Sequence, residues 1–189
     1  MRLLIGQYSI GGIIMPKRKL GMDVLTAAEA RISWAFDECE KVYLSFSGGK
    51  DSSVMLHMVM AEAVKRNRKV GLFFIDWECQ ISLTVDYVRD MYAKYAEWIE
   101  PYWVALPIKT WNACSQFEPE WTAWDPNKKG LWVREADKAS ITTPEQFPFY
   151  YDGISFEEFV PAFGQWYADG KRTAAFVGIR SDESLNRFR

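Results

Sequence analysis

The chain has 189 residues, of which 49% are hydrophobic, and its formal net charge is −2. This length fits a single domain that buries about 70% of its unfolded surface. The nearly balanced charge excludes a general electrostatic attraction to nucleic acids or membranes, so any anion site must be a local arrangement. Three cysteines (Cys39, Cys79 and Cys114) share no metal-ligand spacing. Their odd number predicts free thiols and a reducing, cytoplasmic compartment.

Residues 3–14 are apolar, but this stretch is shorter than the roughly 20 residues that a membrane-spanning helix needs. The basic residues at 17–19 follow it, whereas in a secretory signal they would precede it. We therefore expect no membrane segment. Residues 1–16 are interpreted as a flexible leader, with an edge strand or a partner contact as alternatives. Residues 17–189 are interpreted as one domain.

Helical and strand patterns alternate along this domain. Residues 23–40 place apolar side chains on one helical face, and Asp23 is the expected N-cap. Further helices are expected at 51–66, 83–99 and 156–167, and strands at 42–46, 70–75, 102–106 and 174–179. This alternation predicts an α/β fold with a doubly wound, mostly parallel sheet and helices on both faces.

The segment 107–153 interrupts this pattern with four tryptophans and five prolines. A loop of this length inside a compact domain usually has a function or carries small elements of its own. One interpretation is an aromatic mini-core that covers the edge of the sheet. The other is a lid that contacts a protein partner or an acceptor substrate above the site.

The strand at 42–46 runs directly into a glycine turn and a helix. Glycines at 48 and 49 permit unusual backbone conformations, and the following helix start offers unpaired N–H groups that bind anions. The common P-loop is excluded because Leu44 stands where its first glycine would be and Asp51 follows the lysine. We expect a phosphate chain to bind here, the alternative being a turn without a ligand. The candidate residues are Ser47, Gly48, Gly49, Lys50, Asp51, Ser52 and Ser53.

Two further strand ends should lie on the same rim of a parallel sheet. Asp76 follows the second strand and could accept from a ribose hydroxyl or hold a metal; the alternative is a helix cap or a loop carboxylate. Gly178 lies at the end of the last strand and Arg180 follows it, and the guanidinium suits bidentate contact with phosphate or sulfate. A salt bridge from Arg180 to Asp182 or Glu183 is the alternative.

The early Ser-Gly-Gly-Lys-Asp-Ser and the late Gly-Ile-Arg-Ser-Asp-Glu-Ser together resemble the phosphoadenosine phosphosulfate (PAPS) reductase family of the PP-loop, or adenine nucleotide alpha-hydrolase, superfamily. The similarity extends from about residue 17 to the end, and it looks most like a branch found in phage and in immunoglobulin-binding regulators. It implies a five-stranded, mostly parallel sheet. It also implies ATP (with Mg²⁺) or PAPS at 47–53, with Gly178, Arg180 and Glu183 in the late motif and catalytic roles for Lys50 and Arg180.

Two departures from the family pattern bear on activity. No Glu-Cys-Gly segment with a nucleophilic cysteine occurs in the 189 residues, and Asp76-Trp77-Glu78 replaces the expected Asp-Thr-Gly. Without a thiolate, reduction of a sulfonucleotide has no first step. Two functions remain open: an enzyme that transfers adenylyl groups and releases pyrophosphate, and a non-catalytic regulatory subunit that binds a nucleotide. The single histidine, His57, lies inside an expected helix and is interpreted as packed there.

Overall fold

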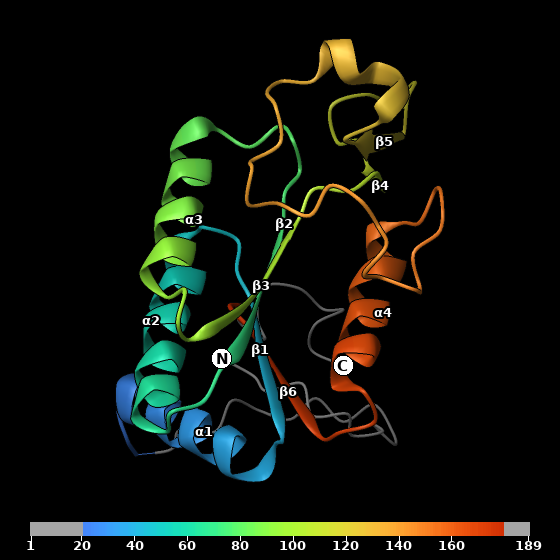
Figure 1. Cartoon of the computed structure of the whole chain (residues 1–189). Helices are drawn as coiled ribbons and strands as arrows, with labels where there is room; N and C mark the ends of the chain where they lie inside the picture. The colour runs from blue at the N-terminus through green and yellow to red at the C-terminus, as the bar shows by residue number, and fades with distance from the viewer. Residues whose placement is uncertain (1–20, 180–189) are drawn as a thin grey trace.

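A parallel sheet of four strands forms the centre of the structure, a computed structural model that describes residues 21–179 (Figure 1). The strands lie in the spatial order β3-β2-β1-β6. Their bounds are β1 (Lys41–Ser45), β2 (Val70–Ile75), β3 (Ile99–Val104) and β6 (Thr173–Val177). All three pairings between them are parallel. The predicted mostly parallel sheet is therefore confirmed, although it has four strands within the described residues instead of five.

Helices cover both faces of this sheet. Three of them, α1 (Val24–Glu38), α2 (Lys50–Lys65) and α3 (Ser82–Lys94), lie on one face, and α4 (Phe156–Ala168) lies on the other (Figure 1). Successive side chains of each strand point to opposite faces of the sheet and therefore belong to two separate cores. Leu44 and Leu72 pack with the first three helices, while Tyr43 and Phe73 pack with α4. The doubly wound arrangement follows from strands that are apolar on both sides.

The register of the strands places three loops along one rim. Ser45 of β1 is paired with Phe73 of β2 and with Val177 of β6. Because the three strands run in the same direction and end at nearly the same level, the segments that follow them leave the sheet side by side. These segments are the turn at 46–49, the loop that starts at Asp76, and Gly178. The rim expected from the sequence is therefore present as far as the described residues extend.

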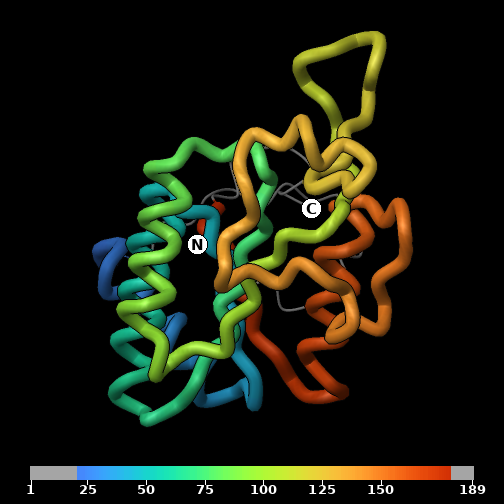
Figure 2. Tube along the Cα trace, turned by 45° about the horizontal axis from the view of Figure 1, so that its top comes forward, coloured from blue at the N-terminus to red at the C-terminus, as the bar shows by residue number. Residues whose placement is uncertain are grey.

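The segment 107–153 carries small elements of its own. It contains an antiparallel hairpin of β4 (Ile108–Trp111) and β5 (Glu120–Ala123), followed by the 3₁₀ helix η1 (Pro126–Leu131). The hairpin and η1 lie beyond the carboxyl end of the sheet, and the tip of the hairpin projects from the body (Figures 1 and 2). Ala123, Trp124 and Trp132 form a small aromatic cluster with Ala105 of the sheet side. The insertion thus has its own small core.

Two boundaries differ most from the sequence prediction. The helix expected at 83–99 ends at Lys94, and the strand expected at 102–106 begins at Ile99. The reason is the parallel ladder, in which Ile99 pairs with Val70 and the Val70 amide donates to the Trp98 carbonyl at 3.1 Å. The aromatic spacing at 92–98 therefore continues past the end of the helix. The expected N-cap is confirmed, since the Asp23 carboxylate accepts from the Thr26 amide at 3.0 Å. The leader 1–16, Arg180 and Glu183 lie outside the described residues.

Candidate functional site

The turn after β1 requires a glycine at position 48. Gly48 has a φ of +73°, in the left-handed region that residues with a side chain rarely adopt. A Cβ atom at this position would also lie 2.8 Å from Cγ2 of Thr84 in α3. The backbone at Gly48 therefore packs directly on α3, which brings the turn close to the loop that joins Asp76 to that helix.

The first turn of α2 presents its amides without a capping side chain. Gly49 is the N-cap residue and makes no side-chain cap hydrogen bond. No acceptor among the described residues bonds the amides of residues 50–52, which are the unpaired donors of a helix start. Together with the helix dipole, they form a site for an anion.

The serine hydroxyls mainly hold the turn together. Ser52 Oγ and Ser53 Oγ donate to the Gly49 carbonyl at 2.9 and 2.8 Å. Ser52 Oγ also lies 3.0 Å from Ser47 Oγ and accepts from the Ser47 amide at 3.3 Å. The sequence predicts Ser52 and Ser53 as phosphate-binding residues, but their hydroxyl hydrogens are used within the turn. The backbone amides and Lys50 are left to meet an anion.

The last strand ends against this helix start. The backbone of Gly178 approaches that of Ser52 so closely that a Cβ atom would lie 3.1 Å from Ser52 Cα. A pocket of about 350 Å³ opens at the same place, with Lys50 and Asp51 beside apolar side chains. Its lining residues are Val24, Ala28, Lys50, Asp51, Val54, Met55, Met58, Gly178 and Ile179. The glycine turn, Lys50 and the end of β6 are thus brought together, as the sequence predicted for Gly178.

Asp76 is buried at the carboxyl end of β2, with 1% of its surface exposed. Its Oδ2 accepts from Trp103 Nε1 at 3.0 Å, and its Oδ1 accepts from the Glu78 amide at 3.0 Å. Oδ1 is also ion-paired with Arg134 of the insertion. Both carboxylate oxygens therefore already have protein donors. The expected contact of Asp76 with a ribose hydroxyl or a metal remains a prediction.

The carboxylate of Glu78 fixes the insertion from the same loop. It accepts from the Trp124 amide at 2.9 Å and from the Val133 amide at 3.3 Å. In addition, Trp124 Nε1 donates to the Asp76 carbonyl at 2.6 Å. Glu78 and Trp124 both have positive φ, +63° and +54°, a strained conformation for residues with side chains. Such strain persists only where the surrounding contacts determine the geometry, as these do.

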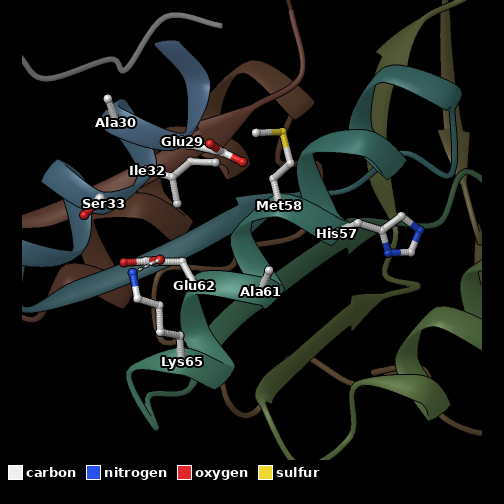
Figure 3. A pocket seen from close by; sticks show the side chains of 9 residues that line it. All are labelled: Glu29, Ala30, Ile32, Ser33, His57, Met58, Ala61, Glu62 and Lys65. Atoms are coloured by element: carbon white, nitrogen blue, oxygen red, sulfur yellow. Dashed lines mark hydrogen bonds and ion pairs between the residues drawn. The ribbon is translucent and has the colours of Figure 1, made fainter. Parts of the chain in front are cut away.

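A second, larger pocket lies in the groove between α1 and α2. It has a volume of about 590 Å³, and Figure 3 shows its lining side chains, with Glu29 on α1 and the ion pair of Glu62 with Lys65 on α2. Two carboxylates beside one paired lysine do not suit a phosphate chain. Met58 lines both pockets, so the groove adjoins the site at Lys50. We place the anion site at the turn because the unpaired amides are there.

The remaining titratable candidates are accounted for by their surroundings. His57 Nδ1 lies 2.6 Å from the Tyr95 hydroxyl, and burial together with Lys94 lowers its pKa. Cys39 is buried, whereas Cys79 and Cys114 lie in exposed loops.

No group of three or more potential metal ligands occurs among residues 21–179. Over the same residues, no helix is both long and apolar enough to cross a membrane.

Residues 41–189 match the model of the phosphoadenosine phosphosulfate reductase domain. The chain belongs to this family. The matched range begins with β1 and includes every site residue named above, from Ser47 to Glu183. The PAPS reductase-like family predicted from the two motifs is therefore confirmed. Family membership and the geometry of the turn agree that this is a nucleotide-binding domain of the PP-loop type.

A curated relative of this PAPS reductase domain is the "Uncharacterized protein YbdN" of Escherichia coli (strain K12). It is 44% identical over 173 residues, which are 91% of this chain and 42% of YbdN. The chain thus spans about two fifths of the length of that relative. No solved structure matches the chain.

Sequence reasoning missed the partners of the β2 loop in this PAPS reductase domain. Arg134 and Trp124 lie in the tryptophan-rich segment 107–153, and the sequence marks Glu78 only as a departure from the family pattern. The signal was present, since an acidic pair right after a buried strand needs donors from elsewhere in the chain. The identity of the donors to these two carboxylates depends on how the insertion folds back on the rim.

Proposed function

We propose that the chain binds an adenine nucleotide, ATP or PAPS, with its phosphates on the turn Ser47–Ser53. The observation that carries this proposal is the start of α2, where unpaired amides follow Gly48 and Gly49 and stand beside Lys50. Membership in the PAPS reductase domain family supports it. Arg180 and Glu183 are proposed to complete the site from the end of β6.

The proposed reaction is chemistry at the α-phosphate, namely adenylyl transfer to an acceptor with release of pyrophosphate. It would depend on positioning and on stabilisation of the leaving group by Lys50, the unpaired amides of residues 50–52 and Arg180. Mg²⁺ would arrive with ATP, and phosphate oxygens and water would supply most of its ligands. Localisation in the cytoplasm and the phage-type branch of the family are part of the same proposal.

A non-catalytic regulatory subunit is the second candidate. The observation that favours it is the state of Asp76, whose two carboxylate oxygens already have protein donors. In this case the nucleotide would be a bound effector, and the insertion 107–153 would contact a protein partner in a larger assembly.

A two-part experiment separates these functions. Calorimetry with ATP and PAPS tests whether a nucleotide binds, and a pyrophosphate-release assay with candidate acceptors tests for catalysis. Binding with pyrophosphate release supports the enzyme, and binding without release under all acceptors supports the regulatory subunit. If neither nucleotide binds to the purified chain, the proposal is wrong.

A further inference from the structure

The ion pair between Asp76 and Arg134 joins the rim of the sheet to the insertion. Asp76 lies at the end of β2, and the neighbouring β1 runs into the glycine turn, with the Phe46 amide donating to the Phe73 carbonyl at 2.8 Å. The turn and the Asp76 loop therefore leave adjacent positions of one rim. Arg134 reaches this rim from the insertion, and its side chain remains 19% exposed.

Arg134 uses only part of its donor capacity in this contact. Its Nη2 donates to Asp76 Oδ1, and its Nη1 makes only a long contact, 3.5 Å, with the Glu135 carbonyl. Its Nε is buried and has no acceptor among the described residues. A buried donor without an acceptor is costly, so it is expected to have a partner in the functional state of the protein.

The guanidinium is also held in a fixed orientation. Its central carbon lies 5.1 Å from the centre of the Trp124 ring, a cation–π contact, and Trp124 is itself fixed by Asp76 and Glu78. A planar fork that is already oriented loses little freedom on binding an oxyanion. Arg134 thus combines an oriented cation, an unused donor and an ion pair with the strand end that lies next to the glycine turn on the rim.

We infer that Arg134 is a ligand-binding residue that the insertion contributes to the nucleotide site. This inference rests on the proposed function. One nitrogen of the guanidinium holds Asp76, and a second donates to an anionic oxygen of the nucleotide bound at 47–53. Nucleotide binding therefore tightens the attachment of the segment 124–137 to the rim, and the insertion acts as a lid that detects the charge of the ligand.

The test compares Arg134→Lys with Arg89→Lys in the full chain. Arg89 is the matched control because it also ties the insertion to the body, through Asp137 at 2.8 Å, but from α3 and not from the rim carboxylate. Both variants keep the positive charge, and Arg134→Lys retains a cation for Asp76 while losing the fork. Calorimetry should show ATP or PAPS binding about tenfold more weakly to Arg134→Lys and within about twofold of wild type to Arg89→Lys.

Two further measurements separate ligand contact from a structural role. Adenosine lacks the anionic oxygens, so its affinity should be the same for wild type and Arg134→Lys. Hydrogen exchange in the wild type should slow at residues 124–137 when ATP or PAPS is added, and this effect should be lost in Arg134→Lys. The wild-type part of the hydrogen-exchange measurement does not depend on the stability of a variant.

The outcomes for the two proposals differ. If wild type binds no nucleotide, the proposed function fails and this inference fails with it. If wild type binds a nucleotide but 124–137 gains no protection, or if Arg134→Lys binds ATP and PAPS as tightly as Arg89→Lys does, only the role of Arg134 is refuted. Equal weakening for adenosine and for the phosphorylated ligands would likewise refute it and show a structural ion pair.

Discussion

Gly178 and Ser52 pack backbone against backbone, and a Cβ atom on Gly178 would lie 3.1 Å from both the N and the Cα of Ser52. This contact joins the end of β6 to the helix start that forms the proposed anion site. Any side chain at position 178 must push the two apart, since backbone atoms cannot move aside as the end of a flexible side chain can.

Gly178→Ala should therefore destabilise the protein by about 1–3 kcal/mol, the usual cost of overpacking a tight contact. Urea unfolding of the two proteins gives the difference. Gly130→Ala is the matched control, because a Cβ atom there meets nothing within 4 Å. Equal stabilities for the two variants would mean that the end of β6 moves away without cost.

Lys50→Ala should weaken the binding of ATP or PAPS by about 1.5–3 kcal/mol, the range for a hydrogen bond to a charged group. The reason is that Lys50 is the cation at the pocket beside the unpaired amides of α2. Calorimetry measures the change. Lys65→Ala serves as control, since Lys65 lies at the other end of α2 and pairs with Glu62. Wild-type affinity in Lys50→Ala would contradict the site.

Stability should fall at alkaline pH because buried tyrosines resist ionisation. Burial, followed by the Glu100 carboxylate, raises the pKa of Tyr102 to about 12 from its ordinary value of 10.0. The unfolded chain releases this proton first, so the contribution of Tyr102 is complete below pH 10 and is lost as the pH rises towards 12. Burial raises the pKa of Tyr92 and Tyr167 in the same direction.

Thermal melts from pH 8 to pH 11.5 check this expectation with Tyr102→Phe as the comparison. The variant should lose less stability over the range than wild type does, although it should still lose some through the other two tyrosines. If both proteins lose the same amount above pH 10, Tyr102 does not ionise differently in the folded and unfolded chains.

The 189-residue chain should not release sulfite from PAPS in the presence of thioredoxin. The nucleophile would have to be one of three thiols: Cys39 is buried and has a pKa raised by that burial, while Cys79 and Cys114 are loop residues. A sulfite assay on the purified chain decides the matter. Robust sulfite production would show that a loop thiol acts as the nucleophile, and Cys79→Ser and Cys114→Ser would then identify it.

ATP, PAPS or sulfate should raise the melting temperature of wild type, and the rise should be smaller in Arg180→Ala. A ligand that binds only the folded state stabilises it by mass action, and Arg180 and Lys50 are proposed to hold the same anion. Arg180→Lys should recover part of the rise, since a point charge cannot replace the bidentate fork. The same rise in wild type and Arg180→Ala would mean that Arg180 forms a structural salt bridge.

The order of helices and strands could be predicted because hydrophobic periodicity and glycine punctuation are local properties. The turn at 47–53 was found for the same reason, and its strand-turn-helix context is present. The use of Ser52 and Ser53 within the turn could not be predicted, because a hydroxyl suits a carbonyl and a phosphate equally well. The partner of Asp76 was also missed. Arg134 lies 58 positions away and comes near only when the insertion folds over the rim.

The insertion also covers part of an edge of the sheet. β3 is a terminal strand of the described sheet, and such a strand offers unpaired amides and carbonyls to the strands of other molecules. Ile141 covers part of this border: its amide donates to the Trp103 carbonyl at 2.6 Å, and its carbonyl accepts from the Ala105 amide at 2.9 Å. A proteolytic cut near Ile141 should therefore promote self-association through β3, even in a protein whose main core is intact.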